Sequence, residues 1–429
     1  MYTTRFNIKD KSEEMKDKLH EDANKIIIAS IKAVMPDSAV VEGIKNMPEY
    51  KGRLIVFSIG KAGWQMAYAL SKLNITPDAG LIVTKYGHYG GKIQGYEIIE
   101  AGHPIPDENS CLAGKRALEM IENLDRDDLV LALISGGASA LFEVPLVPLS
   151  EMTNITSQLL GSGADIVEIN TIRKRLSAVK GGKFALKCLP ARVYSIMLSD
   201  VLGDIPDMIA SGPTCPDPSD YVRAAEIIDR YKIKLSEQAR KLLKNETPKQ
   251  LPNASYTISG SVSELCLAAA EKCRELGYET IILTDSLSCQ AREAGSFLAS
   301  VARYYAEKKK QLAIIAGGEA VVKLTGNGKG GRNQELVLAA AEKIAGLDNV
   351  LIFSLGSDGT DGPTDAAGGI VDGKTVGLLE IRGVSVKSVL DNNDSYDALK
   401  KCGGLIITGP TGTNVNDISC ILIGEPGLR

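Results

Sequence analysis

Aromatic residues, histidine and net charge are all scarce in this sequence. Phenylalanine, tryptophan and tyrosine make up 5% of the 429 residues, and 49 basic residues nearly balance 53 acidic ones. So few aromatic rings argue against a surface that stacks nucleic-acid bases. A net charge of −4 argues against binding nucleic acid or anionic membranes through a basic face. With three histidines and no HExxH or Cys/His cluster, the usual zinc sites are excluded.

Long hydrophobic runs and paired cysteines are also absent. The longest uncharged apolar stretch, 129–142, is interrupted by Ser135-Gly136-Gly137 and is shorter than the roughly 18 residues of a membrane span. The eight cysteines form no CxxC pair, which is typical of small core side chains. The first 22 residues hold no apolar segment of the kind that a secretory signal requires. We therefore expect a cytoplasmic protein that binds neither membrane nor nucleic acid.

Short β-branched runs alternate with segments of helical periodicity. The strand-like runs lack strict apolar/polar alternation, which is typical of parallel sheets covered on both faces, and the alternation with helices predicts an α/β fold. Proline- and charge-rich sequence at 215–255 separates two such patterns, so we expect two domains, 1–240 and 241–429. In the second domain, strands 312–316 and 321–324 are close enough to form a hairpin, which predicts a mixed sheet. Strands are expected at 54–59, 80–84, 96–100, 129–134, 193–198, 256–258, 280–283, 312–316, 321–324, 350–355, 405–408 and 418–423, and helices at 13–35, 62–73, 110–124, 261–275, 289–308 and 333–345, with two more in 215–255.

Glycine is in excess, at 43 of 429 residues. Most glycine clusters follow directly on a predicted strand, where open α/β sheets bind their ligands. Glycine and serine loops that open helices expose backbone N–H groups suited to phosphate. The aspartates of the same loops suit Mg²⁺, which usually binds one or two carboxylates and the phosphates of a substrate. This combination predicts phosphoryl transfer. The clusters are 60–63, 135–139, 199–204, 210–214, 317–319, 326–335, 356–362 and 409–414.

Two glycine motifs indicate other kinds of nucleotide site. Residues 368–375 match the P-loop pattern GxxxxGK[ST], but the preceding residues do not resemble the buried strand that a P-loop follows. The loop Gly326–Gly331 matches the GxGxxG pattern of dinucleotide-binding proteins, after a predicted strand and before a predicted helix. Against that reading, the loop region carries Lys329 and Arg332, and its leading strand looks like half of a hairpin. A dinucleotide site stays open as an alternative.

Eight segments, in unbroken order over roughly residues 20–425, carry a family resemblance. They are FSIGKAG (57–63), AGHPIPDENS (101–110), LISGGASALFEVP (133–145), INTIRKRLSAVKGGKFA (169–185), LSDVLGDIPDMIASGPTCPDPS (198–219), GGRNQELVLA (330–339), SLGSDGTDGPTDAAGG (354–369) and TGPTGTNVNDI (408–418). Together they resemble the glycerate 2-kinase family, whose members transfer phosphate from ATP to D-glycerate and give 2-phosphoglycerate. The resemblance implies two three-layer α/β/α domains, a Rossmann-like, mostly parallel N-terminal sheet and a mixed C-terminal sheet of the MOFRL type. It also implies an active site in the cleft between the domains.

The resemblance further implies which residues form the site. The family's GKA lysine falls on Lys61 and its GGRNQE arginine on Arg332, and both are expected to stabilise charge on the transferring phosphoryl group. Asp200 is expected to accept the proton of the substrate hydroxyl. The loops that contain SGGxSAL and GPTGTN are expected to bind phosphate or carboxylate, the GGRNQE loop the nucleotide, and three aspartates the metal. The substrate- or phosphate-binding residues are Ser135, Gly136, Gly137, Ser139, Thr411, Gly412, Thr413 and Asn414; the nucleotide-binding residues are Gly328, Gly330, Gly331 and Asn333; the metal ligands are Asp204, Asp358 and Asp361.

The implied co-substrate is ATP and the implied metal is Mg²⁺ or another divalent cation, with glycerate as the small-molecule partner. A homo-oligomer is compatible with this reading. Some family members have been labelled hydroxypyruvate reductases, so an NAD(P)H-dependent hydroxypyruvate reductase that uses Gly326–Gly331 is the alternative function. For the aspartates, and for Glu319, a helix cap or Asx-turn is an equal alternative. His103 either lines the cleft or forms a rigid turn, and Lys374 lies where the family shows no constant lysine.

Overall fold

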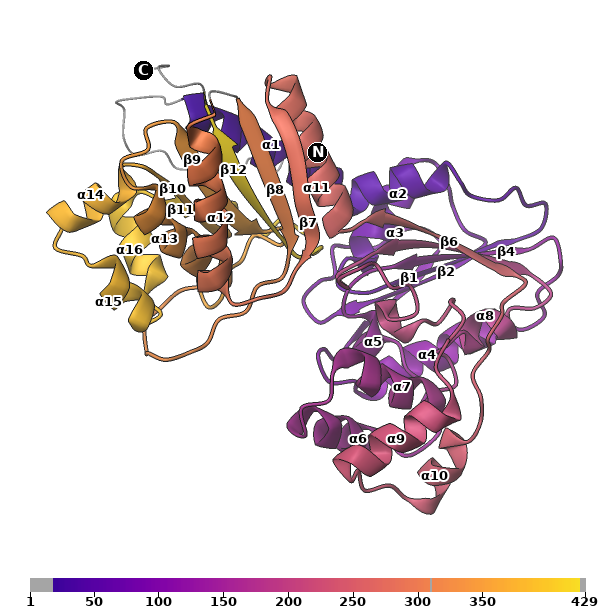
Figure 1. Cartoon of the computed structure of the whole chain (residues 1–429). Helices are drawn as coiled ribbons and strands as arrows, with labels where there is room; N and C mark the ends of the chain where they lie inside the picture. Colours follow the sequence, from indigo (N-terminus) through magenta and orange to yellow (C-terminus); the bar gives the residue numbers. More distant parts are fainter. Residues whose placement is uncertain (1–17, 309–310, 425–429) are drawn as a thin grey trace. The chain divides into compact units, whose positions relative to one another are not determined.

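The computed structural model describes residues 18–308 and 311–424, which fall into two compact units (Figure 1). The parallel unit is Pro36–Ser259. The mixed unit combines the described residues up to Met35 with those from Gly260 onward. Each unit contains one six-stranded sheet. No helix among the described residues is both long enough and apolar enough to cross a membrane.

The parallel unit is built on a sheet with strand order β3-β2-β1-β4-β5-β6. The pairs β3/β2, β2/β1, β1/β4 and β4/β5 are parallel. Every residue of the central strands β1 and β4 is buried, as their unbroken apolar sequences predict. The prediction of a mostly parallel first sheet is therefore confirmed. The strands are β1 (Leu54–Ile59), β2 (Ala79–Lys85), β3 (Tyr96–Ala101), β4 (Leu129–Ile134), β5 (Arg192–Leu198) and β6 (Ala254–Gly260).

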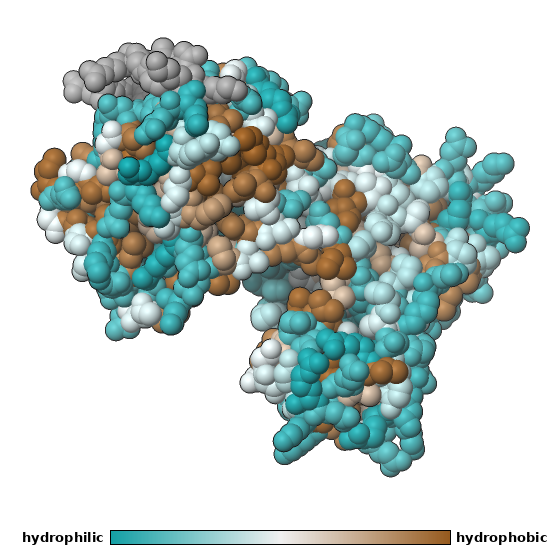
Figure 2. Space-filling view, viewed as in Figure 1, coloured by the Kyte–Doolittle hydropathy of each residue, from teal (hydrophilic) through white to brown (hydrophobic). Residues whose placement is uncertain are grey.

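Helices of the parallel unit cover the sheet and form an additional helical layer. Phe57 and Phe142 pack edge-on against Phe184 in the core on one face of the sheet. Helices α6, α7, α9 and α10 group around a separate core (Figure 1), and the surface over α9 and α10 is largely hydrophilic (Figure 2). The helices are α2 (Pro36–Ile44), α3 (Gly63–Lys72), α4 (Glu108–Met120), α5 (Ala138–Leu141), α6 (Leu149–Gly161), α7 (Ile166–Leu176), α8 (Lys183–Lys187), the 3₁₀ turn η1 (Ile209–Ser211), α9 (Tyr221–Tyr231) and α10 (Glu237–Leu243).

The mixed unit is built on a sheet with strand order β11-β10-β9-β12-β8-β7. β12 runs antiparallel to β8 and β9, whereas β7 and β8 are parallel, so the prediction of a mixed second sheet is confirmed. The strands are β7 (Glu279–Leu287), β8 (Leu312–Gly318), β9 (Val350–Gly356), β10 (Gly368–Asp372), β11 (Leu405–Ile406) and β12 (Asp417–Ile423), and the helices are α1 (Lys18–Ala33), α11 (Val262–Glu275), α12 (Ala291–Ala306), α13 (Arg332–Ile344), α14 (Thr375–Ile381), α15 (Val386–Asp391) and α16 (Ser395–Cys402).

The division of the chain differs from the expected boundary at 240/241. Helix α1 packs against α11, β9 and β12 and buries Ile26, Ile27 and Ile31, so the described N-terminal residues belong with the mixed unit. At the other end, β6 continues the parallel sheet to Gly260. The first five residues of the helix expected at 13–35 lie outside the described residues.

One local expectation is wrong. Residues 321–324 form no strand, because Val321 makes only an isolated bridge to Gln290 and β8 pairs instead with β7 and β12. The P-loop match, which the residues before it disfavour, is no loop, because β10 contains its first five residues and α14 begins at Thr375. The missed strand β10 begins with two glycines, which hide its strand character in the sequence.

Candidate active site

The loops after β1 and β4 meet at the carboxyl end of the parallel sheet. The backbone N–H of Lys61 donates to the carbonyl of Gly136 at 2.9 Å, and the N–H of Ala62 donates to Ser135 Oγ at 3.1 Å. From β1 the chain builds outward through β2 to β3, and from β4 it builds in the other direction to β5 and β6. The two loops therefore lie at the point of reversal, where open α/β sheets bind their ligands.

Two glycines allow these loops to approach each other. Gly60 has a φ of 131°, and a Cβ at this position would lie 2.1 Å from Ser135 Oγ. Gly137 has a φ of 83°, and a Cβ there would lie 3.0 Å from Cδ2 of His103 and 3.1 Å from Cγ of Lys61. Both positions need glycine for backbone conformation and for space. The side chains of Lys61 and His103 thus flank the loop after β4.

His103 is neutral at physiological pH. Burial, followed by the positive charges of Lys61 and Lys85, lowers the pKa of His103 to about 4. The imidazole therefore acts as a hydrogen-bond donor and acceptor beside Lys61 and adds no charge to the site.

Asp200 and Asp204 follow β5, the next strand of the sheet. A Cβ on Gly136 would lie 2.4 Å from Oδ2 of Asp200, so this carboxylate lies against the loop after β4. Asp204 has a left-handed backbone, with a φ of 50°, and its buried Oδ1 has no hydrogen-bond partner. An unpartnered buried carboxylate oxygen is costly in a protein without a ligand.

The 135–139 loop also contacts a segment with an unusual backbone conformation. Ala210, Ser211 and Gly212 all have φ between 56° and 62°, a region that residues other than glycine seldom adopt. Ser211 Oγ lies 2.9 Å from Ser139 Oγ and donates to Oδ1 of Asn170 at 2.9 Å. Two serine hydroxyls are therefore paired at the end of the 135–139 loop.

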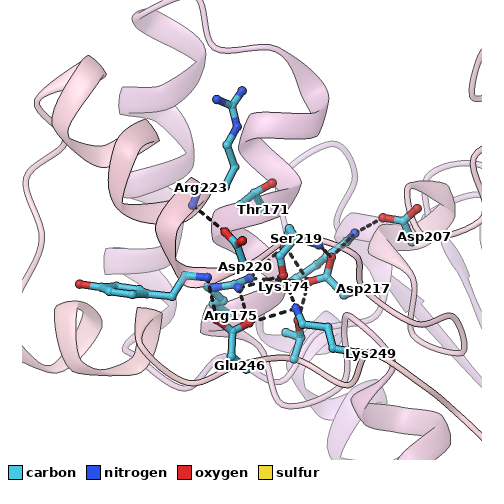
Figure 3. A network of polar contacts seen from close by, with 12 residues as sticks. Thr171, Lys174, Arg175, Asp207, Asp217, Ser219, Asp220, Arg223, Glu246 and Lys249 are labelled. Carbon is cyan, nitrogen blue, oxygen red and sulfur yellow. Dashed lines mark hydrogen bonds and ion pairs between the residues drawn. The ribbon is translucent and has the colours of Figure 1, made fainter.

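A network of ion pairs, buried for the most part, lies next to this segment (Figure 3). Lys174 Nζ lies 2.5 Å from Oδ2 of Asp207 and 3.2 Å from Oδ1 of Asp217. Arg175 contacts Asp217 at 3.6 Å and Glu246 at 3.0 Å. Lys174, Arg175 and Asp217 are completely buried, and the carboxylates of the network are used by its own cations.

In the mixed unit, Arg332 is held by two carboxylates. Its Nε and Nη2 donate to the two oxygens of Asp417 at 2.5 and 2.8 Å, and Nη1 lies 3.2 Å from Glu319 Oε1. Hydrogen bonds to Asp417 raise the pKa of Arg332, while burial raises the pKa of Asp417 to about 6. The side chain of Arg332 is one-third exposed, so the two carboxylates fix the guanidinium while part of the side chain faces solvent.

Asp361 caps α13, which starts with Arg332. Its Oδ1 accepts from the N–H of Asn333 at 3.1 Å and its Oδ2 from the N–H of Gln334 at 2.9 Å. Gly331, the N-cap residue, has no side chain for this task, and a Cβ there would lie 2.2 Å from Cγ of Asp361. Two backbone N–H groups in the first turn of α13 are therefore satisfied by the protein itself, as the helix-cap alternative predicts.

The glycines of the 326–331 loop lie against residues 392–395. A Cβ on Gly328 would lie 2.5 Å from the carbonyl oxygen of Asn392, and one on Gly330 would lie 2.2 Å from Ser395 Oγ. Residues 319–325 separate the loop from the end of β8, so it does not follow a strand directly, and the helix that it opens is capped by Asp361. A dinucleotide motif needs both a preceding strand and a free helix N-terminus, so the GxGxxG match does not have the structure of such a site.

The loops around Asp358 and Thr411 are held together by their own hydrogen bonds. Asp358 Oδ1 accepts from the N–H of Thr360, and the carbonyl of Asp358 accepts from the N–H of Thr411. Thr411 Oγ1 donates to the carbonyl of Ser357, and Thr413 Oγ1 donates to that of Val34. Asp358 thus forms an Asx-turn.

Gly412 and Asn414 belong to the same loop as Thr411 and Thr413. Gly412 has a φ of 87°, and a Cβ there would meet no atom within 4 Å. Asn414 Oδ1 accepts a hydrogen bond from the backbone N–H of Asn416 at 3.5 Å, the limit of hydrogen-bond distance. With both threonine hydroxyls bonded to the protein, the open backbone at Gly412 is the part of this loop that is accessible to an anion.

The carboxylates of the expected metal site are not gathered into one cluster. Within residues 18–308 and 311–424, no group of three or more His, Cys, Asp or Glu side chains is arranged to hold a metal ion. Mg²⁺ requires only one or two carboxylates when a phosphate completes its ligands. Asp204, with an unpartnered buried oxygen, meets that requirement better than Asp361, whose two oxygens accept backbone N–H groups.

Four residues of these sites were not identified from sequence: Arg173, Lys180, Ser211 and Asp417. All four lie within segments that carry the family resemblance, but none belongs to a glycine cluster except Ser211. Lys174, Arg175 and Lys180 are buried despite their charge, and charged residues are almost never fully buried unless they are paired. A run of basic residues on a helix whose apolar spacing places them on its buried face is the signal that could have identified them from the sequence.

Comparison with protein families shows matches over both units. Residues 22–244 match a family described as "Domain of unknown function (DUF4147)", and residues 312–417 match the MOFRL family. A solved structure of glycerate kinase from Thermotoga maritima superimposes with a TM-score of 0.91 at 50% identity, covering 95% of this chain and 99% of that one.

Several curated proteins are similar to this chain over nearly its whole length. A D-glycerate 2-kinase from Thermotoga maritima is 49% identical over 414 residues, which is 95% of this chain and 99% of the relative. A glycerate 2-kinase from Pyrococcus horikoshii is 42% identical and covers 94% of each chain. A protein from Agrobacterium vitis named putative hydroxypyruvate reductase is 41% identical and covers 93% of each chain.

Proposed function

The chain belongs to the glycerate 2-kinase family, and we propose that it transfers the terminal phosphoryl group of ATP to the 2-hydroxyl group of D-glycerate. The observation that carries this proposal is the convergence of Lys61, the 135–139 loop and Asp200 at the carboxyl end of one parallel sheet. A cation, a glycine loop with backbone N–H groups and a carboxylate are the groups that phosphoryl transfer to an alcohol uses. The near full-length similarity to a D-glycerate 2-kinase supports the choice of substrate.

The reaction forms a bond between the 2-oxygen of glycerate and the γ-phosphorus and breaks the bond between that phosphorus and the β–γ bridging oxygen. Asp200 accepts the proton of the 2-hydroxyl group as the new bond forms. The ammonium group of Lys61 stabilises the negative charge on the transferring oxygens. ADP and 2-phosphoglycerate are the products.

The loop after β4 supplies the backbone groups of this site. Gly136 and Gly137 carry no side chain, so an anion can approach the N–H groups of the loop closely. The neutral imidazole of His103 beside Gly137 donates or accepts a hydrogen bond and does not compete with Lys61 for the anion.

Arg332 of the mixed unit has a similar role toward phosphate. Its bidentate pair with Asp417 fixes the plane of the guanidinium, and its remaining N–H groups on Nη1 and Nη2 are suited to phosphate oxygens. In this proposal Arg332 binds and stabilises phosphoryl oxygens, and Asp417 and Glu319 position it. Gly412 offers a further open stretch of backbone in the same unit.

A divalent cation such as Mg²⁺ is part of the proposal because the phosphates of ATP carry several negative charges. Asp204 would hold it, since the buried Oδ1 of that residue has no partner in the protein. When bound, the cation neutralises charge on the phosphates. Asp358 and Asp361, also expected as ligands, are engaged in an Asx-turn and a helix cap.

Reduction of hydroxypyruvate with NAD(P)H is not favoured. That alternative depends on the Gly326–Gly331 loop, which does not follow a strand directly and opens a helix that Asp361 already caps. A dinucleotide would have to displace a carboxylate with two hydrogen bonds to the helix. The name of one relative, putative hydroxypyruvate reductase, therefore has no structural counterpart in this loop.

A coupled assay tests the proposal. D-Glycerate, ATP and Mg²⁺ are supplied with enolase and pyruvate kinase, and phosphoglycerate mutase is left out. We expect pyruvate to form without mutase, since enolase uses 2-phosphoglycerate directly. Pyruvate that forms only after mutase is added would place the phosphate on the 3-hydroxyl group. Oxidation of NADH by hydroxypyruvate, without ATP turnover on glycerate, would contradict the kinase.

A further inference from the structure

Arg173 contacts the end of the 135–139 loop, and only some of the N–H groups of its guanidinium have hydrogen-bond partners. Its Nη2 donates to the carbonyl of Ser139 at 2.9 Å, whereas its buried Nε has no hydrogen-bond partner. The side chain is 13% exposed, in contrast to the completely buried Lys174 and Arg175 that follow it on α7. Part of the Arg173 side chain is therefore exposed at the end of the loop that carries the proposed substrate site.

The positive charge at this place exceeds the negative charge that is available to it. Among the described residues, the carboxylate that pairs with Arg173 is that of Glu143, at 3.9 Å, and the same oxygen lies 3.8 Å from Nζ of Lys180. Lys180 and Glu143 are completely buried, and Lys180 otherwise donates to the carbonyls of Phe142 and Ala210. Two cations thus share one carboxylate.

The neighbouring carboxylates are already used. Asp207 and Asp217 pair with Lys174 and Arg175 in the network of Figure 3. Burial lowers the pKa of Arg173 and lowers that of Lys180 to about 8, as expected where the protein leaves positive charge without full compensation. A buried cation without a partner is costly, so an anion that arrives here would be stabilised.

We propose that Arg173 binds an oxyanion of the substrates at the end of the 135–139 loop, either the carboxylate of glycerate or a phosphate of the nucleotide. Apart from the buried Nε and the bond from Nη2 to Ser139, the planar guanidinium has N–H groups of the kind that carboxylate and phosphate both accept. The paired hydroxyls lie at the same loop end, where Ser211 donates to Asn170 and Ser139 donates to Ser211. Lys180 is a positioning residue, because it fixes the carbonyls of Phe142 and Ala210 on either side of the loop. The inference rests on the proposed function for the identity of the anion.

The test compares Arg173→Met and Arg173→Lys with the wild type and with Arg116→Met. Arg116 is an exposed arginine of the same unit that pairs with Glu97 and Glu119 on the surface, so its variant controls for the loss of a charge. Isothermal titration measures the Kd for D-glycerate, for glycerol, which lacks the carboxylate, and for a non-hydrolysable ATP analogue. Thermal unfolding of each variant is followed in parallel.

We expect Arg173→Met to weaken the binding of one ligand, D-glycerate or the ATP analogue, by at least 100-fold and the binding of the other by less than threefold. Loss for D-glycerate assigns Arg173 to the carboxylate, and loss for the ATP analogue assigns it to phosphate. Removing Arg173 leaves Lys180 and Glu143 as a balanced pair, so the unfolding temperature should stay close to that of wild type. Unchanged affinity for both ligands would overturn the proposal, as would an affinity loss of the same size in Arg116→Met.

Arg173→Lys covers the case in which the methionine variant does not fold. It keeps the charge but lacks the planar fork, and we expect at least a tenfold loss for the same ligand; unchanged affinity for both would overturn the proposal. If the wild type does not phosphorylate glycerate, the proposed function fails by itself. Titration with inorganic phosphate then tests Arg173 separately, and equal phosphate affinity in wild type and Arg173→Met would refute the anion site.

Discussion

Gly136→Ala is the substitution that most sharply tests the placement of Asp200. The added Cβ would lie 2.4 Å from Oδ2 and 3.0 Å from Cγ of that aspartate. An ordinary carbon contact is about 3.5 Å, so the carboxylate has to move by about 1 Å. Misplacing a reacting group by this distance costs about 100-fold in rate, or about 2.7 kcal/mol of transition-state stabilisation. We therefore expect kcat to fall about 100-fold.

The same substitution should have little effect on stability. The obstructing atoms belong to the end of a flexible side chain, and moving it off its rotamer costs about 0.5–1.5 kcal/mol. Gly161→Ala is the matched control, because Gly161 ends helix α6 of the same unit and a Cβ there would meet no atom within 4 Å. That variant should keep wild-type kcat and gain a few tenths of a kcal/mol in unfolding free energy, up to about 1 kcal/mol.

Steady-state kinetics with D-glycerate and ATP, together with urea unfolding, measure both effects. Wild-type kcat in Gly136→Ala, with the variant folded, would refute the assignment of Asp200 as the base. A fall in kcat that is matched by a loss of several kcal/mol in unfolding free energy would show that the glycine is needed for folding instead. Asp200→Asn, which leaves the loop unchanged, should reproduce the loss of kcat.

Three further predictions concern the buried charges. Asp417 is ionised above its pKa of about 6, so kcat should fall as the pH drops below 6. The pH–rate profile of Asp417→Asn should have a lower plateau and lack this extra fall. Matching profiles of variant and wild type would show that Asp417 does not position Arg332. Burial lowers the pKa of Lys180 from 10.5 to about 8. Between these two pH values the unfolded chain binds a proton that the folded chain has lost, so the unfolding free energy rises with pH by up to about 1.4 kcal/mol per pH unit. Urea unfolding of Lys180→Met from pH 8 to 10 should lack this contribution, and an unchanged pH dependence would contradict it. Asp361→Ala removes the cap of α13 and should lower the unfolding free energy by about 2 kcal/mol, measured by urea unfolding; an unaffected variant would mean that the cap is not needed.

Much of the fold could be predicted because its strands are short, apolar and buried on both faces. The sequence 54–59 is a run of apolar residues with a single serine and forms a fully buried central strand. The sequence 129–134, which is apolar throughout, forms another. The partner of an amphipathic helix is harder to predict, because periodicity shows which face is buried and not what covers it. For this reason α1, which packs on α11, could not be assigned to the mixed unit from its sequence.

The candidate site was predictable where glycine marks a loop and less so where side chains interact over a long distance in sequence. The loops at 60–63 and 135–139 were both expected at strand ends, and their backbone contact follows from the adjacency of β1 and β4. Asp361 and Arg332 lie in different motifs, and only the structure shows that one caps the helix that carries the other. A carboxylate in a loop has the same sequence pattern whether it binds a metal or caps a helix.

The position of the phosphoryl group on the product tests the central proposal most directly. In proton-coupled ³¹P NMR, a phosphate on the 2-hydroxyl group of glycerate is split by one methine proton into a doublet, and a phosphate on the 3-hydroxyl group is split by two methylene protons into a triplet. With D-glycerate, ATP and Mg²⁺, we predict a doublet that grows with ADP. A triplet, or no new phosphate ester while hydroxypyruvate is reduced with NADH, would contradict the assignment of this chain as a glycerate 2-kinase.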